Sequence, residues 1–465
     1  MPQTLFDKIW ESHVIEDFGD GWALLHIDRL LIHDLGGAPA LNELKRRGLK
    51  VRNPELVFAT PDHAVSSAPG RTGETFPEGA QLWSGLRKMT REAGIRLFDL
   101  GEDGQGIVHV MGPELGLVLP GATLICGDSH TCTNGGMGAL AFGVGSTECV
   151  HALATQTIRQ RKPRRMRIRL DGALGQGVTP KDVILHVIGK FGAAAGVEHS
   201  IEYAGSAIRQ MDIDGRLTIC NLSVEMGAKS GIVAPDDKTF AYLAGRPFAP
   251  GGKVLEQALL HWRSLASDDD AAFDRDETVN VAEVSPTITW GTSPQHAIAI
   301  DDMIPDPSTE SDLDARATMR AALDYMGLEA GRSIAGTKVD WVFIGSCTNS
   351  RLSDLRDAAR FAKDRRVDAR VTAWVVPGSL AVKRQAEAEG LDRIFRNAGF
   401  QWREPGCSMC VAANGERIPP GARCVSTTNR NFVGRQGPHA RTHLASPAMA
   451  VAAAVTGAIS DVRCL

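Results

Sequence analysis

The stretch VDWVFIGSCTNSRLSDLRDAARFAK, Val339–Lys363, decides the fold class. Its first part is a run of apolar and β-branched residues without polar alternation, which is typical of a strand buried on both faces. A glycine turn follows, and the segment that begins at Leu352 has helical periodicity. Strands buried on both faces occur in parallel sheets that are covered by helices. The stretch therefore predicts an α/β protein.

The same succession of apolar run and glycine turn recurs elsewhere in the chain. It appears in ATLICGDSH, Ala122–His130, and in TAWVVPGS, Thr372–Ser379. In open parallel sheets, ligands collect at the carboxyl ends of the strands, where these turns stand. Polar residues in the turns are therefore the first candidates for a functional site.

The length of the chain predicts more than one domain. Its 465 residues are too many for one hydrophobic core, so two or three domains are expected. The acidic segment Ser264–Asn280 is predicted to connect domains, with a boundary near residue 285. Residues 1–285 are expected to form two α/β lobes with an internal boundary near residue 200, and residues 286–465 a further α/β domain.

Charge and hydropathy exclude several classes of partner. The net charge of −4 gives no overall basic field, so nucleic acid is not an expected partner. The first residues lack the apolar core of a signal peptide, and no window resembles a membrane span, so a cytoplasmic enzyme without membrane association is expected. The small-residue stretch AMAVAAAVTGAI near the carboxyl terminus predicts a packed helix.

Three of the nine cysteines stand in glycine-containing turns. An odd number of cysteines, scattered without a secretion signal, does not indicate a disulfide framework. Cys347 lies in FIGSCTNSR, between a predicted strand and a predicted helix, where the helix dipole favours a thiolate. Cys407 and Cys410 form a C-x-x-C pair in PGCSMC. These three thiols are the candidates for metal ligands.

The C-x-x-C pair allows several interpretations, of which core packing is one. A structural zinc site needs four ligands, and no second pair is visible in the sequence. A thioredoxin-like pair would open a long helix, but PGCSMCVAANGERIPPG is too rich in Gly and Pro. An electron-carrying cluster usually takes four cysteines. Three thiolates would leave one iron of a 4Fe–4S cluster free to polarise a substrate hydroxyl, which indicates catalysis.

Five spaced motifs together resemble the aconitase superfamily, and the similarity covers essentially the whole chain. They are GDSHTCTNGGMGALAFGVGSTE (Gly127–Glu148), ICNLSVEMGAK (Ile219–Lys229), GSCTNSR, PGCSMC and NRNFVGRQG (Asn429–Gly437). GIVHVMGPE (Gly106–Glu114) and the total length bring the chain close to the large subunits of the isopropylmalate dehydratases, a branch of that superfamily. The resemblance implies a three-lobed α/β/α architecture with mostly parallel sheets that lacks the mobile swivel domain.

In the two-subunit members of the superfamily the swivel domain is a separate small subunit. The resemblance therefore implies a small-subunit partner in a heterodimer or higher heteromer. It also implies one 4Fe–4S cluster per subunit, bound by Cys347, Cys407 and Cys410, with one iron not ligated by protein. The base of the family, a serine of the swivel domain, is then expected on the partner.

The implied reaction is a hydro-lyase reaction of leucine biosynthesis. Water leaves 2-isopropylmalate and returns to 2-isopropylmaleate with reversed regiochemistry, which gives 3-isopropylmalate without net redox change. LGGAPALNEL, which follows His33 and Asp34, departs from the usual pattern of the family, and so does the separate segment SSAPGRTGETF (Ser66–Phe76). A dehydratase of another alkylmalate, acting on citraconate or 2,3-dimethylmalate, is therefore the alternative. An RNA-binding cluster sensor is disfavoured by the negative charge, and an electron carrier by the missing fourth cysteine.

Two Asp/His pairs are candidates for proton transfer. Asp128 and His130 follow a predicted buried strand, where a carboxylate can fix the tautomer of an imidazole. The plain alternative is a polar turn with Ser129 or Thr131 as a helix cap. Asp62 and His63 repeat the pairing in FATPDHAVS, and the resemblance implies that they protonate the departing hydroxide.

The remaining candidates depend more heavily on the resemblance. Asn221 and Glu225 would share one face of a helix, with an N-cap Asn as the alternative, and their implied contacts are the cluster and its bound hydroxyl. A histidine among apolar residues is usually structural, but His109 aligns with a pocket histidine of the family. The resemblance further implies substrate contacts, or contacts close to the cluster, for Ser129, Asn429, Arg430, Arg435 and His33.

Arginine at positions 430 and 435 has a chemical rationale of its own, because its guanidinium can bind a carboxylate through two hydrogen bonds. The remaining thiols were assigned no ligand role. Structural roles are expected for Cys126, Cys132, Cys149, Cys220 and Cys424, and none is assigned to Cys464.

Overall fold

A computed structural model describes residues 2–465, which fall into two compact units. Of the described residues, the first unit comprises 2–65, 72–172 and 194–279. The second comprises residues 66–71, 173–193 and 280–465. Two short segments, 66–71 and 173–193, therefore belong to the second unit. The chain that flanks each of them on both sides belongs to the first unit. The predicted boundaries near residues 200 and 285 stay predictions.

The first unit contains a five-stranded parallel sheet in the order β5-β4-β3-β6-β7. Its strands are β3 (Arg29–His33), β4 (Val57–Thr60), β5 (Arg96–Leu97), β6 (Thr123–Cys126) and β7 (Leu140–Gly143). The helices that lie along the chain between them are α2 (Gly37–Arg46), α3 (Pro77–Ala93), α4 (Val108–Leu115) and α5 (Ser146–Thr155). β6 confirms the strand that ATLICGDSH predicts, and all four of its residues are buried.

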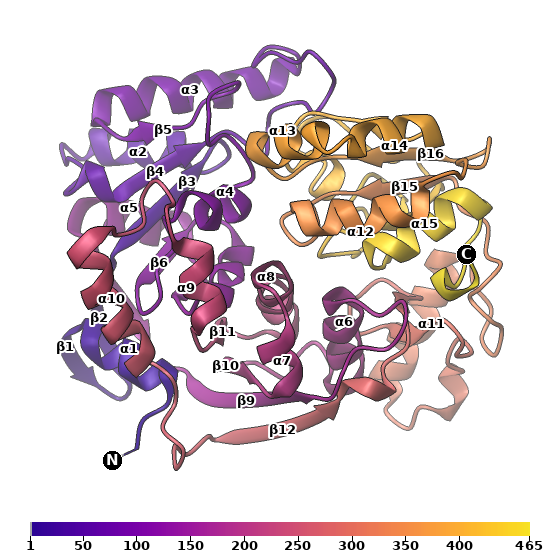
Figure 1. Cartoon of the computed structure of the whole chain (residues 1–465), viewed down its shortest axis with the longest axis horizontal. Coiled ribbons are helices and arrows are strands. Elements are labelled where there is room, and N and C mark those ends of the chain that lie inside the picture. The colour runs from indigo at the N-terminus through magenta and orange to yellow at the C-terminus, as the bar shows by residue number, and fades with distance from the viewer. Residues whose placement is uncertain (1) are drawn as a thin grey trace. The chain divides into compact units, whose positions relative to one another are not determined.

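A second sheet of this unit has four strands in the order β11-β10-β9-β12. Its strands are β9 (Arg164–Asp171), β10 (His199–Ala204), β11 (Ser230–Val233) and β12 (Arg275–Asn280), and β9 and β12 run side by side in Figure 1. The predicted connector Ser264–Asn280 is thus partly wrong, because its last six residues form β12. Its charges pair with β9: Arg165 Nε lies 3.0 Å from Asp274 Oδ2, and Arg167 pairs with Asp276.

The other elements of the first unit include a small antiparallel sheet in the order β1-β2-β8. Its strands are β1 (Val14–Gly19), β2 (Trp22–His26) and β8 (Thr157–Arg161). The remaining helices of the unit are α1 (Leu5–His13), α7 (Ser206–Gln210), α8 (Ile213–Asn221), α9 (Asp237–Leu243) and α10 (Gly252–Ser264). A single cluster of buried apolar side chains contains residues of α1, of β3, β6 and β7, and of α8.

The second unit is built on another five-stranded parallel sheet, in the order β17-β16-β15-β18-β19. Its strands are β15 (Trp341–Ile344), β16 (Thr372–Val375), β17 (Gln401–Trp402), β18 (Arg423–Ser426) and β19 (Arg441–Leu444). β15 and β16 confirm the strands that Val339–Ser350 and Thr372–Ser379 predict. The order reverses beside β15, and ligands of open parallel sheets typically bind beyond the carboxyl ends of the strands at such a point.

The helices of the second unit are α6 (Pro180–Phe191), α11 (Leu313–Met326), α12 (Leu352–Ala362), α13 (Leu380–Ala388), α14 (Leu391–Ala398) and α15 (Pro447–Thr456), and β13 (Thr287–Thr289) pairs with β14 (Ala297–Ala299). α15 confirms the packed helix predicted near the carboxyl terminus, with eight of its ten residues buried. Short 3₁₀ turns complete the two units: η1 (Pro54–Leu56), η2 (Ser129–Met137), η3 (Leu222–Met226), η4 (Val281–Glu283), η5 (Pro307–Thr309), η6 (Ser408–Cys410) and η7 (Val462–Cys464).

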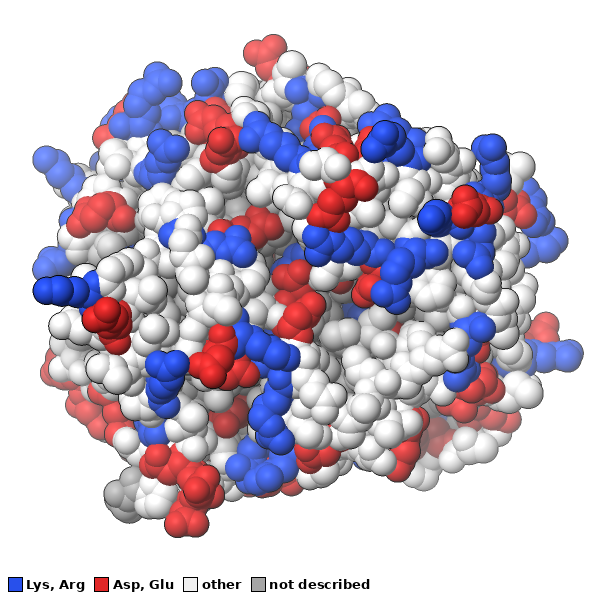
Figure 2. Space-filling view, viewed as in Figure 1, with Lys and Arg blue, Asp and Glu red and all other residues white. Residues whose placement is uncertain are grey.

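The fold class is confirmed as α/β with mostly parallel sheets, and Figure 1 shows helices packed along them. Across residues 2–465, every helix is too short or too polar to cross a bilayer. On the face drawn in Figure 2, basic and acidic side chains are interspersed rather than gathered into a field of one sign. That distribution agrees with the net charge of −4.

Candidate active site

Three neighbouring parallel strands of the first unit each deliver polar residues at their carboxyl ends. His33 is the last residue of β3, and Asp34 follows it. Asp62 and His63 come directly after β4. Asp128 comes two residues after β6 ends. Because β4, β3 and β6 are adjacent and parallel, their carboxyl ends bring these side chains together.

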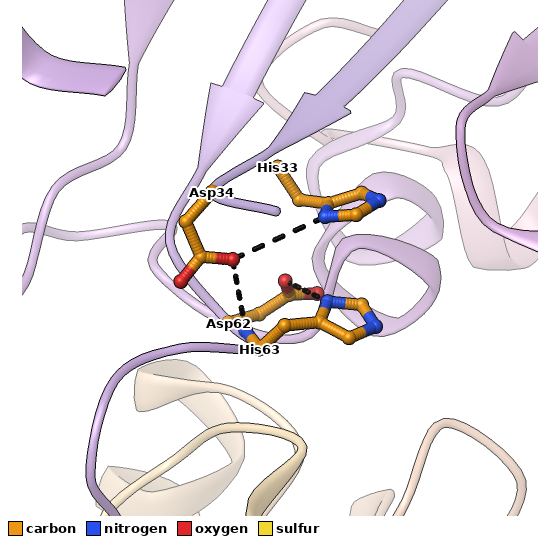
Figure 3. A group of neighbouring side chains, drawn as sticks. All are labelled: His33, Asp34, Asp62 and His63. Carbon is orange, nitrogen blue, oxygen red and sulfur yellow. Dashed lines mark hydrogen bonds and ion pairs between the residues drawn. The ribbon is translucent and has the colours of Figure 1, made fainter. Parts of the chain in front are cut away.

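The pair Asp62 and His63 is tightly hydrogen-bonded, as Figure 3 shows. Asp62 Oδ1 lies 2.5 Å from His63 Nδ1, and Asp62 Oδ2 accepts from the backbone N–H of Val108 at 2.9 Å. Burial raises the pKa of Asp62, but the neighbouring imidazole of His63 and its hydrogen bond lower it more, so the net shift is downward. The carboxylate therefore stays charged and fixes which nitrogen of His63 faces it.

His33, Asp34, Asp62 and His63 place one ligand atom each within 4.8 Å of one another, and all four residues are buried. Hydrogen bonds account for much of this closeness. Asp34 accepts from the backbone N–H groups of His63, at 3.0 Å, and Ala64, at 2.8 Å. Burial raises the pKa of Asp34, and the nearby Asp62 carboxylate raises it further. The group in Figure 3 thus forms a polar network around the turn that carries His63.

His33 is the unsatisfied member of this group. Its ring stacks on the ring of His63, with centroids 4.4 Å apart, and the residue is 4% exposed. Neither ring nitrogen has a hydrogen-bond partner within residues 2–465. Asp34 Oδ1 lies 4.0 Å from His33 Nδ1, which is an ion-pair distance but too long for a hydrogen bond. Burying an imidazole without hydrogen bonds costs free energy, so this ring indicates a place for a polar ligand.

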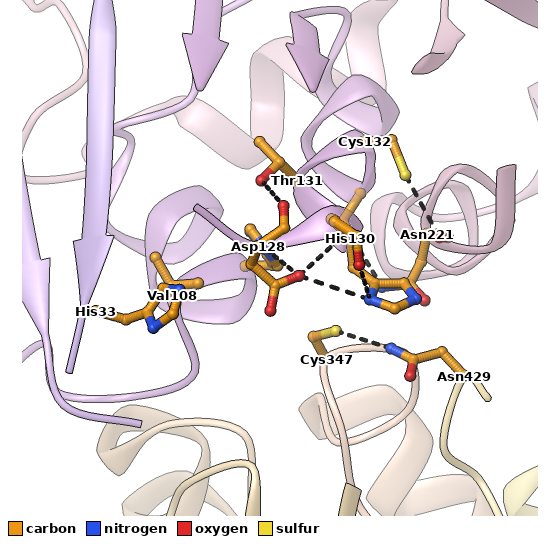
Figure 4. A network of polar contacts seen from close by, with 12 residues as sticks. His33, Val108, Asp128, His130, Thr131, Cys132, Asn221, Cys347 and Asn429 are labelled. Carbon is orange, nitrogen blue, oxygen red and sulfur yellow. Dashed lines mark hydrogen bonds and ion pairs between the residues drawn. The ribbon is translucent and has the colours of Figure 1, made fainter. Parts of the chain in front are cut away.

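Asp128 is the centre of a wider histidine network. Its Oδ2 lies 3.1 Å from His63 Nε2, and its Oδ1 lies 3.4 Å from His109 Nε2. Oδ1 also accepts from the backbone N–H of His130 at 2.6 Å, so Asp128 itself caps η2. The predicted alternative of a cap at Ser129 or Thr131 is therefore wrong, and Asp128 serves the turn and the histidines at once (Figure 4).

The histidines determine the charge of Asp128. Burial alone raises the pKa of this carboxyl, but hydrogen bonds from His109, His130 and His63 outweigh it and hold the pKa well below its usual range. Three imidazoles around one carboxylate are the residue types that general acid–base catalysis uses.

His130 is held from its other side by Glu225. Its Nε2 lies 2.7 Å from Glu225 Oε1. The amide of Asn221 donates to Thr133 Oγ1 at 2.7 Å, within the same 3₁₀ segment that carries His130. α8 ends at Asn221 and Glu225 lies in η3, so the expectation that both residues share a face of one helix is wrong. The change of helix type re-aims Glu225 toward His130.

The three candidate thiols lie at the carboxyl edge of the sheet in the second unit. Cys347 comes three residues after the end of β15, and Cys407 and Cys410 lie in the loop and 3₁₀ turn after β17. All three are buried, with 5–6% of their surface exposed. The serines beside them, Ser346 and Ser408, have positive φ angles of 80° and 48°. Such strain persists where surrounding contacts fix the backbone, and it is common at functional sites.

Asn429, which follows β18, connects two of the sulfurs. Its Nδ2 donates to Cys347 Sγ at 3.4 Å (Figure 4). Its Oδ1 lies 3.5 Å from Cys410 Sγ. The side-chain amide therefore lies between these two sulfurs. Among the described residues the three sulfurs are not all within 4.8 Å of one another. A single zinc ion with bonds of about 2.3 Å would draw its thiolates closer than that.

The donor set fits an iron–sulfur cluster better than a single ion. Three buried sulfurs lie in loops at one sheet edge, and a cluster takes cysteine thiolates as ligands. Four of the other thiols are poor candidates because burial raises their pKa values: those of Cys126 and Cys220 well above their usual range, that of Cys149 to about 11, and that of Cys424 strongly upward. Thiols of that kind stay protonated and act as small apolar residues.

The two predicted arginines lie in the loop after β18. Arg435 is half-buried, and its Nη2 lies 4.0 Å from Cys410 Sγ. Its Nε is buried without a hydrogen-bond partner among residues 2–465. Arg430 is also half-buried. An unpaired guanidinium nitrogen beside a candidate ligand cysteine indicates that an anion completes its hydrogen bonds.

Several residues of this architecture were not among the predicted site residues. Asp34 follows His33 in the sequence, in the same kind of strand-end pair as Asp62 and His63, and that repetition was an available signal. Lys181 and Glu416 left no such signal. Lys181 is fully buried, and its Nζ donates to the carbonyl oxygens of Thr427 and Thr428, at 3.0 and 2.7 Å, just before Asn429. Burial lowers the pKa of Lys181 to about 7.

Comparison with known proteins gives the class to which this fold and donor set belong. The model of the aconitase family (aconitate hydratase) matches residues 7–457, and the chain belongs to that family. The three thiols fit the iron–sulfur cofactor that this family implies.

Within this family, the chain is most informatively compared with relatives that share most of its length. The chain is 63% identical over 461 residues to "3-isopropylmalate dehydratase large subunit 1" of Bradyrhizobium diazoefficiens, covering 99% of this chain and 96% of that one. It is 51% identical over 467 residues to "3-isopropylmalate dehydratase large subunit" of Anaeromyxobacter dehalogenans, covering 99% and 97%. A solved structure, aconitase X of Thermococcus kodakaraensis in its holo form, is 14% identical with a TM-score of 0.45 and covers 88% of this chain and 84% of that one.

Proposed function

We propose that this chain is the cluster-carrying large subunit of a hydro-lyase that isomerises 2-isopropylmalate to 3-isopropylmalate through 2-isopropylmaleate, in leucine biosynthesis. The observation that carries the proposal is the identity of 63% with a curated large subunit across nearly the whole of both chains. The buried Asp/His network and the three thiols supply the residue types that removal and return of water require.

In this proposal the residues of the first unit handle protons. Asp62 binds His63 Nδ1 at 2.5 Å and thereby leaves Nε2 on the opposite side of the ring. That nitrogen lies 3.1 Å from Asp128, which also faces His109 and His130. His63 is then the acid that protonates the departing hydroxide. Asp128 stabilises the imidazolium form of His63 before the transfer, which leaves a neutral imidazole. His130, oriented by Glu225, lies ready to orient the hydroxyl.

The residues of the second unit bind the cofactor and the substrate's charge. Cys347, Cys407 and Cys410 would hold a 4Fe–4S cluster with one iron not ligated by protein, which acts as a Lewis acid on the substrate hydroxyl. Asn429 spans Cys347 and Cys410 and keeps their separation fixed. Arg435, whose Nε is unpaired among the described residues, binds a substrate carboxylate, and Arg430 assists it.

Three residues of the first unit would make further polar contacts with the substrate. The unpaired ring of His33 offers a hydrogen bond, and Ser129 and Asn221 lie beside the residues that orient the hydroxyl. The relatives are large subunits by name, so we propose a small-subunit partner that carries the swivel domain and the serine that abstracts the proton. The chain alone is then expected to be inactive.

The test is an anaerobic assay of the purified chain, alone and mixed with the small subunit from the same source. Formation of the unsaturated acid is followed by its ultraviolet absorbance, with 2-isopropylmalate, citraconate and 2,3-dimethylmalate as separate substrates. We expect activity only in the mixture and at the highest kcat/KM with 2-isopropylmalate. Inactivity with all three in the reconstituted complex would contradict the lyase assignment. A preference for citraconate or dimethylmalate would contradict only the leucine-pathway substrate.

A further inference from the structure

A partly buried carboxylate of the second unit ties two distant stretches of chain together. Glu416 follows the C-x-x-C pair by six residues, and its side chain is 11% exposed. It binds the segment Ser66–Arg71, which belongs to the same compact unit but lies some 350 residues earlier in the chain. That segment begins three residues after His63. We call Glu416, Arg403, Ser67 and Ser408 the carboxylate clamp.

Each oxygen of Glu416 accepts three hydrogen bonds. Oε1 accepts from Ser66 Oγ at 2.9 Å, from the Ser67 backbone N–H at 2.8 Å and from the Arg403 guanidinium at 2.9 Å. Oε2 accepts from Ser67 Oγ at 2.7 Å, from Ser408 Oγ at 2.6 Å and from Asn414 Nδ2 at 2.9 Å. Such complete satisfaction is what makes a buried charge tolerable and rigid.

The cation of the clamp is itself held in place. Arg403 Nε donates to Ser67 Oγ at 2.9 Å, and the guanidinium stacks over the ring of Trp374 at 3.6 Å from its centroid. The backbone N–H of Glu404 also donates to the Ser67 carbonyl at 2.8 Å. Ser67 therefore binds the Glu416 carboxylate, the Arg403 guanidinium and the backbone N–H of Glu404, and so fixes the segment Ser66–Arg71.

The clamp reaches the C-x-x-C pair through Ser408, which stands directly after Cys407. Ser408 is fully buried and has a φ of +48°, a left-handed conformation that a residue with a side chain rarely adopts. Its Oγ donates to Glu416 Oε2 and lies 3.0 Å from Ser67 Oγ. These hydrogen bonds offset the strain, and the direction of the Cys407 and Cys410 side chains depends on that turn.

We propose that Glu416 is a positioning residue that holds the C-x-x-C turn in the conformation that binds the iron–sulfur cluster and anchors Ser66–Arg71 to that turn. The proposal rests on the proposed function in so far as the thiols bind a cluster. Glu416→Gln replaces one carboxylate oxygen by an NH2 group, which cannot accept the hydrogen bonds that the serine hydroxyls and the Asn414 amide donate to Glu416. It also removes the ion pair with Arg403. Both the turn and the anchored segment then lose their shared partner.

The first test uses the cluster-free chain, so it does not depend on the proposed function. The Arg71–Thr72 bond lies at the end of the anchored segment, where Thr72 is exposed, and its cleavage by trypsin is followed by mass spectrometry. We expect Glu416→Gln to speed this cleavage about tenfold or more, because the hydrogen bonds it breaks involve a charged acceptor. Glu416→Asp, which keeps the charge, should restore part of the protection. The matched control is Glu389→Gln, which removes an exposed ion pair with Arg356 in the same unit.

The second test measures how fast the visible absorbance of the reconstituted cluster is lost in air. We expect Glu416→Gln and Ser408→Ala to lose it several-fold faster than the wild type. Ser66→Ala should speed trypsin cleavage with little effect on the absorbance, since Ser66 contacts Glu416 but not Ser408. Wild-type rates of both cleavage and cluster loss in Glu416→Gln would overturn the inference. Failure of the wild type to bind any cluster would instead overturn the proposed function.

Discussion

Asp128 is the residue on which the largest number of predicted catalytic side chains converge. His63, His109 and His130 all lie within hydrogen-bond or ion-pair distance of its carboxylate. We expect Asp128→Asn to keep the fold, because an amide oxygen can still cap η2, but to lower kcat by about 10²–10⁴-fold. Steady-state assays of the reconstituted complex measure the loss, and circular dichroism checks the fold. An Asp128→Asn variant with full activity would remove Asp128 from the proposed proton-transfer network.

The charge of Asp128 also predicts a pH dependence of stability. Hydrogen bonds from the three histidines outweigh burial and place the pKa of the folded state below the unfolded value of about 3.9. A depressed pKa contributes stability that is present above the unfolded pKa and is lost as the pH falls through the folded one. The difference in free energy of unfolding between wild type and Asp128→Asn should thus be constant above about pH 5 and shrink below about pH 4. Urea titrations at several pH values measure it, and a difference that grows toward acid pH would contradict this sign.

Cys347 gives the sharpest prediction for the cofactor. We expect Cys347→Ser to fold but to hold no stable cluster, because a hydroxyl at this position is a poor iron ligand. Cys424→Ser is the matched control: its thiol lies in β18 of the same sheet, and burial keeps it protonated. Visible absorption after anaerobic reconstitution distinguishes the two. A full cluster spectrum in Cys347→Ser would show that the predicted ligand set is wrong.

At the residue scale, site residues could be predicted only where neighbouring residues in the sequence marked them. Asp62, His63 and Asp128 stand just after apolar runs, so strand-end logic located them and the structure brings them together. Glu416 could not be found this way, because its partners Ser66 and Ser67 lie about 350 residues away and no local pattern marks them. The helical face expected for Asn221 and Glu225 failed because α8 gives way to a 3₁₀ turn between them.

At the element scale, β12 shows where pattern rules break down. RDETVN carries three charged residues, a pattern that predicts a connector, yet it forms the edge of a sheet because β9 offers a backbone ladder and basic partners. Central strands such as β15 were predictable, since strands buried on both faces show a continuous apolar run. Edge strands have one exposed side, so their sequences need not contain a continuous apolar run.

This account of β12 predicts which of its side chains matters for stability. Val279 is 2% exposed, so Val279→Ala should lower the free energy of unfolding by about 2 kcal/mol. Asp276→Asn removes a part-exposed ion pair with Arg167 and should cost less than about 1 kcal/mol, and less still in high salt. Urea denaturation at two salt concentrations compares the two variants. A larger loss in Asp276→Asn would mean that charge rather than packing holds this strand.

At the scale of the whole molecule, the division into two compact units predicts how cofactor binding spreads. The candidate cluster ligands all belong to the second unit, whereas the Asp128 network belongs to the first. A ligand that binds only the folded state stabilises whatever unfolds together with its site. Removing the cluster should therefore speed amide hydrogen exchange by about tenfold or more in the second unit's loops at residues 345–350, 407–412 and 427–431. The strands β3 and β6 of the first unit should exchange at unchanged rates.

Cys347→Ser supplies the control for this experiment, because its exchange should match that of the cluster-free wild type whether or not iron and sulfide are added. Equal acceleration in both units would show that the chain opens as one cooperative body. In that case the cluster would stabilise the proton-transfer residues as well as its own loops, and cluster loss would be expected to disorder His63 and Asp128. Acceleration confined to the second unit would mean instead that the Asp/His network of the first unit is formed before the cluster is inserted and does not depend on it.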